Sequence, residues 1–134
     1  MIVVDTNIIA HLMISGTRSQ QAEQIFRKDP IWVAPLLWQS EFCNVLVLYI
    51  RKDLIDLLDA VKLMEEASTI MHEREFQVSS VLVLKLADPS TCSAYDCEFV
   101  ALAHDLGVPL VTADGQILDS FPQVATSPEA FLAS

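Results

Sequence analysis

Short runs of apolar residues alternate with longer stretches of helical periodicity along the chain, and this alternation constrains the fold more than any other feature. Three runs stand out, at residues 2–4, 31–34 and 108–112, with weaker candidates at 75–78 and 124–125. Uninterrupted apolar runs of this length are typical of strands buried on both faces of a parallel sheet. Because helical segments separate them, the chain predicts an α/β fold with a central, mostly parallel sheet flanked by helices.

The helical segments are defined by their apolar spacing and by the residues that end them. We expect helices at 19–28, 36–51, 53–72, 80–87 and 93–106, and a final helix that begins at Ser127-Pro128. In the segment 53–72 apolar side chains recur at helical spacing, namely Leu54, Leu57, Leu58, Val61, Met64, Ala67 and Met71. This segment follows helix 36–51 across Lys52-Asp53, so the two predict a helical hairpin in the middle of the chain.

The size and composition indicate one ordered domain over residues 1–134. Hydrophobic residues make up 52% of the chain, which excludes a disordered protein. No apolar run reaches the roughly 18 residues of a membrane span, and the acid at position 5 argues against a secretion signal. Cys43, Cys92 and Cys97 form no CxxC pair, which favours free thiols and a cytoplasmic protein without membrane association.

Two aspartates stand at the ends of predicted strands. Asp5 directly follows strand 2–4, and Asp114 comes two residues after the run 108–112. Because the carboxyl ends of parallel strands open onto one ligand crevice, we expect both carboxylates at the same rim of the sheet. Each also has a simpler interpretation, with Asp5 as a helix cap and Asp114-Gly115 as a turn.

Two further acids lie on apolar faces of predicted helices. Glu41 interrupts the apolar face of helix 36–51, and a buried carboxylate is usually neutralised, paired or bound to a metal. Asp96 lies near the start of helix 93–106, with Phe99 and Val100 along the same face. A favourable interaction with the helix dipole is the alternative explanation for Asp96.

Taken together, the four acids indicate a metal site. Carboxylates gathered in one crevice repel each other unless cations compensate. Oxygen ligands without Cys or His partners select Mg²⁺ or Mn²⁺, and two such ions can support an in-line displacement at a phosphodiester. The chain has no HExxH zinc motif, no GxxxxGK[ST] or GxGxxG phosphate loop and no GxSxG nucleophile motif. The residue types therefore favour metal-dependent phosphoryl chemistry.

Four sequence blocks resemble, in order, the motifs of the PIN domain and, within it, of the VapC-like ribonuclease toxins of bacterial toxin–antitoxin pairs. The blocks are Val3-Val4-Asp5-Thr6-Asn7, Ser40-Glu41, Ser93-Ala94-Tyr95-Asp96 continuing to Val100-Ala101-Leu102-Ala103, and Leu110-Val111-Thr112-Ala113-Asp114. The resemblance covers essentially the whole chain. It implies a PIN-like fold and endonucleolytic cleavage of RNA, with Asp5, Glu41, Asp96 and Asp114 gathered around Mg²⁺ or Mn²⁺.

The resemblance also implies roles for individual residues and a partner. Asp5 and Asp96 would be the principal metal ligands, while Glu41 and Asp114 would complete the site and one of them would place the attacking water. Beside these acids, three polar residues would orient a carboxylate or a metal-bound water, namely Asn7, Ser93 and Thr112. An antitoxin encoded alongside would cover the acidic crevice, with an arginine in bidentate contact with the carboxylates.

The charge distribution limits how such a chain would hold RNA. Its 8 Lys and Arg against 18 Asp and Glu leave a formal charge of −10, which excludes a broad electrostatic RNA binder. No Lys or Arg follows Lys85, so we expect phosphate contacts from Arg18 and from Arg51-Lys52, which lie at helix ends. The alternative is that these are ordinary solvated cations. We expect neutralising Arg18 or Arg51 to weaken RNA binding more than neutralising Lys62.

Two other functional classes remain open from the sequence. A non-catalytic PIN-like protein-interaction module would not need four acids in its crevice. A phosphoacceptor domain, which holds Mg²⁺ beside one phosphorylated aspartate, gives Glu41 no role. The apolar residues of helices 36–51 and 53–72 exceed what one small core needs. We therefore expect a homodimer, whether the chain is an enzyme or an interaction module.

Overall fold

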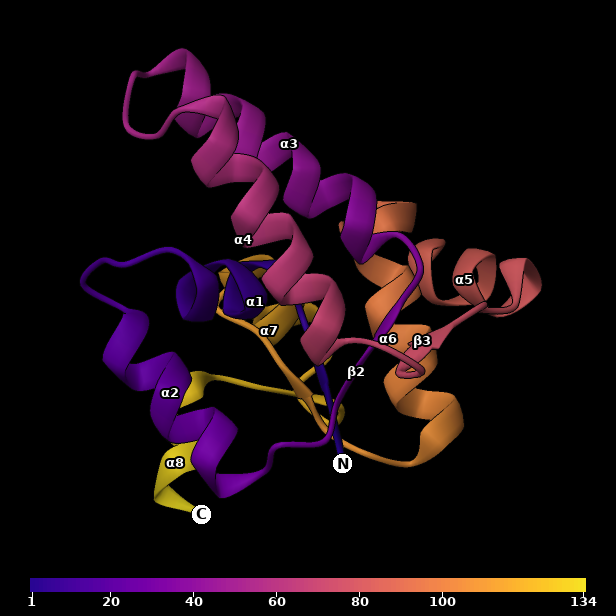
Figure 1. The fold of residues 1–134 in the computed structure, drawn as a ribbon. Helices are drawn as coiled ribbons and strands as arrows, with labels where there is room; N and C mark the ends of the chain where they lie inside the picture. The colour runs from indigo at the N-terminus through magenta and orange to yellow at the C-terminus, as the bar shows by residue number, and fades with distance from the viewer.

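Five short strands form one parallel sheet at the centre of the computed structural model, which describes residues 1–134 (Figure 1). They are β1 (Ile2–Val4), β2 (Trp32–Pro35), β3 (Glu75–Phe76), β4 (Leu110–Val111) and β5 (Ala125–Thr126), in the order β3-β2-β1-β4-β5. Val3 lies opposite Val33 on one side and Leu110 on the other. The strand order changes direction between β1 and β4, which is where ligands bind in open α/β sheets.

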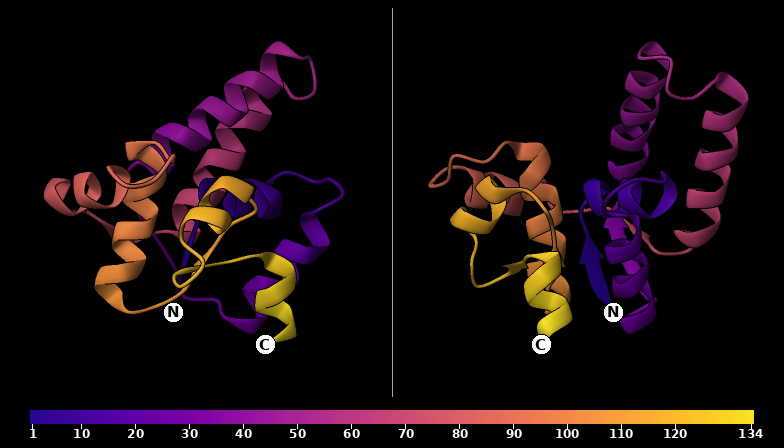
Figure 2. Two further views of the ribbon diagram at one scale, coloured as in Figure 1. Left: turned by 180° about the vertical axis from the view of Figure 1, so that it is seen from behind. Right: turned by 90° about the vertical axis from the view of Figure 1, so that its left-hand side faces the viewer.

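Eight helices surround the sheet, namely α1 (Thr6–Met13), α2 (Ser19–Lys28), α3 (Trp38–Arg51), α4 (Leu57–Ile70), α5 (Ser80–Ala87), α6 (Ala94–Leu106), α7 (Gly115–Ser120) and α8 (Pro128–Ala133). The right-hand view of Figure 2 shows α1 to α4 on one side of the strands and α5 and α6 on the other. On that second side α6 packs on β1, β2 and β4. The C-terminal helix α8 packs against α2. Helices α3 and α4 form a hairpin whose tip points away from the sheet (Figure 1).

The core consists of the strands and the inward faces of the helices. All residues of β1 are buried, and so are Trp32 in β2 and Phe99 in α6. Trp38 and Phe42 are four residues apart on α3, so both project from one face of the helix into the core. Full burial of such a side chain contributes about 1.5–3 kcal/mol. The aromatic pair therefore fixes how the start of α3 sits on the sheet.

The α/β architecture with a parallel sheet and a central helical hairpin is confirmed. The helices predicted at 19–28 and 80–87 match α2 and α5 at both ends. Helix 36–51 begins two residues later than predicted, at Trp38, and helix 93–106 begins at Ala94 with Ser93 as its N-cap.

The start of helix 53–72 is predicted wrongly. Asp53 has a left-handed backbone with φ 58°, which ends the preceding turn. Asp56 is the N-cap of α4, and its side chain and that of Asp59 accept hydrogen bonds from each other's backbone N–H. This reciprocal capping begins the helix at Leu57.

The helical spacing of the apolar residues in α4 predicts that they all face the core, but several of them are exposed. Leu57 and Leu58 are 68% and 79% exposed, and Leu54 just before the helix is 63% exposed. Ala67 and Met71 of the predicted apolar set are buried, and so is Ala60, which was not part of that set. The tip of the hairpin extends past the sheet, so its apolar side chains find no core to enter.

Two of the eight helices, α1 and α7, are missing from the predicted set, although Asp5 as a helix cap anticipates the start of α1. The turn interpretation of Asp114-Gly115 is wrong, because Asp114 is the N-cap of α7. Its Oδ1 accepts hydrogen bonds from the N–H groups of Gln116 and Ile117. None of the helices combines the length and apolar character that crossing a membrane would require.

Candidate active site

Asp5 lies where β1 passes into α1, and its two carboxylate oxygens have different partners. Oδ1 accepts the N–H of Thr6 at 2.8 Å, which caps the helix. Oδ2 accepts the Thr112 hydroxyl at 2.7 Å and the Asn7 amide at 3.3 Å. Both expectations for Asp5, at the rim and as a helix cap, therefore agree with its position.

Burial dominates the electrostatics of Asp5. It raises the pKa of this carboxyl group to about 6, although hydrogen bonds from Thr112 and Thr6 work in the opposite direction. The negative charges of Glu41 and Asp96 raise the pKa further. The carboxylate of Asp5 thus occupies a site where negative charge is costly.

The segment after β4 connects Asp5 to Asp114. The Thr112 hydroxyl, which donates to Asp5, accepts the backbone N–H of Asp114 at 3.0 Å. Asn7 makes a second link, since its Oδ1 accepts the N–H of Ala113 at 3.3 Å. These bonds hold the carboxyl ends of β1 and β4 together and bring the two aspartates to the same edge.

Glu41 enters the site from the first turn of α3. Its Oε1 accepts the Thr6 hydroxyl at 2.7 Å, while Oε2 has no hydrogen-bond partner. Burial raises the pKa of Glu41, the Thr6 hydrogen bond lowers it, and the negative charges of Asp96 and Glu98 raise it further. The start of α3 is anchored on β3, because Trp38 Nε1 donates to Glu75 at 2.7 Å.

Asp96 enters from the opposite side of the sheet, in the first turn of α6. Its backbone N–H donates to the Ser93 hydroxyl at 3.0 Å, which caps the helix. Burial raises the pKa of Asp96, and the charge of Asp114 raises it further. The helix dipole favours an acid here, yet the half-buried carboxylate also faces another acid.

The four predicted acids therefore meet at one edge of the sheet. Asp5 is affected by Glu41 and Asp96, Glu41 by Asp96, and Asp96 by Asp114. No Lys, Arg or His forms an ion pair with any of them. No three of the side chains stand close enough to hold one ion at once. Mg²⁺ commonly retains several waters and uses only one or two carboxylates, so the oxygen donors present fit a hydrated divalent cation.

The candidate cations lie at different distances from the acids. Arg18 is the N-cap residue of α2 and lines a pocket that also contains Asn7. Arg51 is the last residue of α3, ten residues after Glu41, which places it about 15 Å farther along the helix. Lys52 is the C-cap of α3, in the segment that joins α3 to α4.

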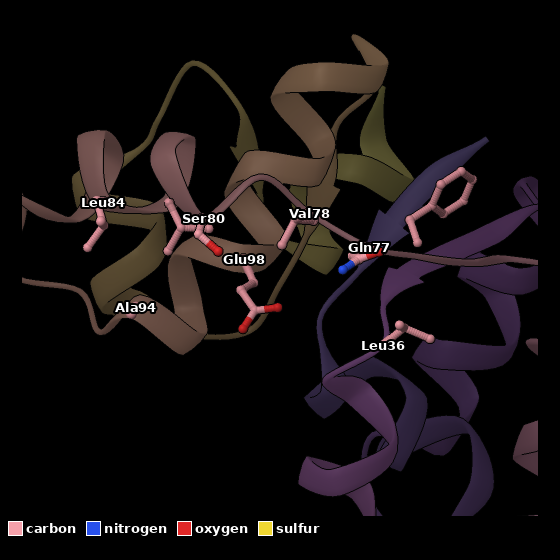
Figure 3. A pocket seen from close by; sticks show the side chains of 9 residues that line it. Leu36, Gln77, Val78, Ser80, Leu84, Ala94 and Glu98 are labelled. Atoms are coloured by element: carbon pink, nitrogen blue, oxygen red, sulfur yellow. The ribbon is translucent and has the colours of Figure 1, made fainter.

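Sequence reasoning missed two residues at this edge. Thr6 donates a hydrogen bond to Glu41. The only sequence signal for this role is the place of Thr6 in the first motif. Glu98 lies two residues after Asp96, a spacing that does not put both on one helix face, and it acts on Glu41 through its charge. Figure 3 shows Glu98 extending from α6 into a pocket of about 360 Å³ whose lining includes Leu36 and Gln77.

Comparison with known proteins identifies the family of this chain. The family model for the PIN domain matches residues 2–124. The chain belongs to the PIN domain family.

Individual relatives of this PIN domain agree in length and fold. Ribonuclease VapC3 of Pyrobaculum aerophilum is 31% identical over 129 residues, which are 93% of this chain and 98% of that protein. The crystal structure of PAE2754 from Pyrobaculum aerophilum matches with a TM-score of 0.78 at 19% identity, covering 98% of this chain and 93% of that one. A toxin–antitoxin complex from Klebsiella pneumoniae matches with a TM-score of 0.71 at 17% identity, covering 96% and 98%.

Proposed function

We propose that this PIN domain is an endoribonuclease that depends on Mg²⁺ or Mn²⁺ and hydrolyses RNA at its four-carboxylate edge. The observation that carries the proposal is the convergence of Asp5, Glu41, Asp96 and Asp114 without a protein cation to neutralise them. The relative named as a ribonuclease supports RNA as the substrate. A pure interaction module would gain nothing from partly buried carboxylates that raise each other's pKa.

Asp5 and Asp96 are assigned as the principal ligands of the cation, with Asp114 completing the set. When bound, a divalent ion supplies positive charge that offsets the carboxylates and stabilises charge developing on the phosphate. Asp5 Oδ2 is held by Thr112 and Asn7, which fix its orientation. Ser93 positions Asp96 by capping α6. These polar partners act through the acids rather than on the substrate.

Glu41 is assigned as the residue that places the attacking water. Thr6 holds Oε1, and Oε2 is free to accept the proton that the water loses as its oxygen attacks phosphorus and an ester P–O bond breaks. The raised pKa of Glu41 suits this task, because a general base works best when its pKa approaches the working pH. Asp114 is assigned to the cation instead, and its Oδ1 accepts the N–H groups at the start of α7.

The proposed biological role is that of a toxin held inactive by an antitoxin. The toxin–antitoxin complex among the structural neighbours supports this role. The antitoxin would cover the acidic edge and place an arginine in bidentate contact with its carboxylates. Expression of the wild-type chain alone should arrest growth, whereas expression of Asp96→Asn at the same level should not. Equal growth of both strains would contradict the toxin role.

A homodimer is proposed as the assembled form, and the exposed leucines of the hairpin are the surface that supports it. The cytoplasm is proposed as the compartment, because all three cysteines are free thiols and two of them are buried. Light scattering at micromolar concentration should give the mass of two chains. A monomer under those conditions would contradict the proposal.

RNA cleavage and its metal requirement test the enzyme directly. End-labelled single-stranded and structured RNAs are incubated with the purified protein in Mg²⁺, in Mn²⁺ or in EDTA. We expect cleavage with either ion, none in EDTA, and recovery when excess Mg²⁺ is added. Asp96→Asn should be inactive and Asp88→Asn, an exposed acid at the end of α5, should be active. A folded, metal-loaded protein that cuts none of these RNAs would contradict the proposal.

The phosphoacceptor alternative makes a different prediction. Incubation with a small phosphodonor and Mg²⁺ would add one phosphoryl group to the chain, which intact mass measurement detects. The hydrogen bond that Glu41 accepts from Thr6, the neighbour of Asp5, supports a role for Glu41, which the phosphoacceptor alternative does not explain. We expect no mass increase.

A further inference from the structure

A second pocket opens beside the carboxylates, between the loop that joins α1 to α2 and one face of α3. Its volume is about 450 Å³, within the range of about 300–1,000 Å³ that small-ligand sites occupy. Asn7, which donates to Asp5, is part of its lining. The pocket therefore adjoins the acidic edge.

Two helix faces lead from the acids into this pocket. On α1, Asn7 and His11 are four residues apart and lie on one face. On α3, Val45 and Tyr49 follow Glu41 by one and by two turns on the same face, which places Tyr49 about 12 Å along the axis. A strand of RNA whose cleaved phosphate lies at Glu41 would reach Tyr49 by following α3.

The pocket differs in charge from the rest of a chain that carries −10. None of the eleven residues that line it is acidic, and the side chain of Arg18, which is one of them, has no hydrogen bond or ion pair. Among the four main pockets it is the one with an arginine and no acid. The pKa of Glu129 on α8 is lowered mainly by hydrogen bonds from its own backbone N–H and from Gln21. The positive charge of Arg18 lowers this pKa by a smaller amount.

Several of the other lining groups are polar and held in place. Burial and the nearby Arg18 lower the pKa of His11, which keeps its ring neutral at pH 7 and able to donate and accept hydrogen bonds. The loop is fixed by Ser19, whose hydroxyl accepts the N–H of Gly16 and donates to the carbonyl of Ile14. Arg18 is thus presented from an ordered loop.

We propose that this pocket binds one nucleotide of single-stranded RNA next to the cleaved phosphate, with Arg18 on a phosphate and the Tyr49 ring against the base. The proposal rests on the ribonuclease function and names a binding site for its substrate. A guanidinium matches phosphate geometry, and an aromatic ring accepts any base by stacking. A basic peptide would be repelled by Arg18, so the charge favours a nucleotide as the occupant.

Mononucleotides test the site separately from cleavage, because they contain no bond that the enzyme could cut between nucleotides. AMP and UMP are titrated into the isotope-labelled protein in EDTA, and amide shifts are followed by NMR. We expect shifts concentrated at His11, Arg18 and Tyr49. Arg18→Ala and Tyr49→Leu should each weaken binding about fivefold or more, since one base stack or phosphate contact is of that size. Tyr49→Phe, which keeps the ring, should bind like wild type.

Arg27→Ala is the matched control, because Arg27 is an exposed arginine at the other end of α2. It should leave mononucleotide binding unchanged. In RNA cleavage, Arg18→Ala and Tyr49→Leu should raise KM about fivefold, and Arg27→Ala should not. Absence of shifts in the pocket, or equal effects of Arg18→Ala and Arg27→Ala, would overturn the nucleotide site. Pocket shifts in a protein that cuts no RNA would support the site and contradict the ribonuclease function.

Discussion

Among the individual residues, Asp5 is the one whose burial makes a negative charge costly in free energy. This residue is 7% exposed, and its pKa rises from 3.8 to about 6, mainly because burial disfavours the charged form. The folded state therefore binds the proton more tightly than the unfolded state, so stability falls as pH rises from 3.8 to about 6 and stays lower above that. At 1.36 kcal/mol per pH unit, the cost at pH 7 is about 3 kcal/mol.

Asp5→Asn should stabilise the metal-free protein at neutral pH because it removes this cost. In EDTA, we expect its melting temperature to exceed that of wild type at pH 7.5, and the difference to shrink at pH 5. Mg²⁺ should raise the melting temperature of wild type at pH 7.5 and have little effect on the variant. Thermal melts followed by circular dichroism measure all three. The same difference at both pH values would show that the burial of charge is not its cause.

Glu98→Gln should shift the pH profile of RNA cleavage. The negative charge of Glu98 contributes to the raised pKa of Glu41, after burial and Asp96. Removing the charge lowers the pKa of the proposed base, so the acidic side of the profile should move to lower pH while the maximal rate stays within a few-fold of wild type. An unchanged profile would contradict the assignment of Glu41 as the base.

Individual acids can be located from sequence because the strand or helix that carries them is visible in the local pattern. Asp5, at the end of an apolar run, is such a case. The partners of the acids are harder to find, because Thr6 and Glu41 are 35 positions apart and meet only in the fold. Glu98 was missed for the same reason, since its influence on Glu41 crosses from α6 to α3.

At the scale of elements, α6 depends on a glycine at its end to pass into β4. Gly107 has φ 65°, the left-handed backbone that favours glycine, and its N–H closes the last turn of α6. Gly107→Ala should therefore lower the free energy of unfolding by about 1 kcal/mol. Gly16→Ala is the control, because Gly16 has no positive φ and open space around it, and its effect should be within about 0.5 kcal/mol. Urea denaturation measures both, and equal losses would contradict the explanation.

Long elements follow from the sequence better than short ones. The buried face of α6 and the caps at Ser79 and Ser93 come from local chemistry. The two-residue strands β3, β4 and β5 exist only through pairing with their neighbours, so their ends could not be placed from apolar runs alone. The exposed apolar face of α4 shows the converse, since helical spacing alone does not say whether a core lies opposite.

For the whole molecule, the exposed apolar residues of the hairpin are the feature that the isolated chain leaves unexplained. Leu54, Leu57 and Leu58 are each more than 60% exposed. Leu58→Asp should convert the proposed dimer to a monomer at micromolar concentration without unfolding it, because the side chain is outside the core. Leu84→Asp changes a leucine on α5 that is 65% exposed, and it should leave the dimer intact. Light scattering distinguishes the two, and a dimeric Leu58→Asp protein would contradict the hairpin as the interface.

The net charge of the molecule is consistent with RNA cleavage once the site is considered. Four of the 18 acids belong to the carboxylate edge, where divalent cations would offset them. The remaining excess disfavours attraction of RNA over long distances, so binding should depend on the metal, Arg18 and local shape. We expect a shallower dependence of RNA affinity on salt than a basic nuclease shows.

The most direct test of the four-carboxylate site is the initial rate of RNA cleavage in saturating Mg²⁺. This rate is compared between the wild type and single variants of the four acids. Asp5→Asn, Glu41→Gln, Asp96→Asn and Asp114→Asn should each lower the rate about 100-fold or more, as expected when charge stabilisation is lost from a transition state. Each variant should retain the circular dichroism spectrum of the folded protein. Cleavage at the wild-type rate by a folded Asp5→Asn or Asp96→Asn protein would contradict the four-carboxylate site.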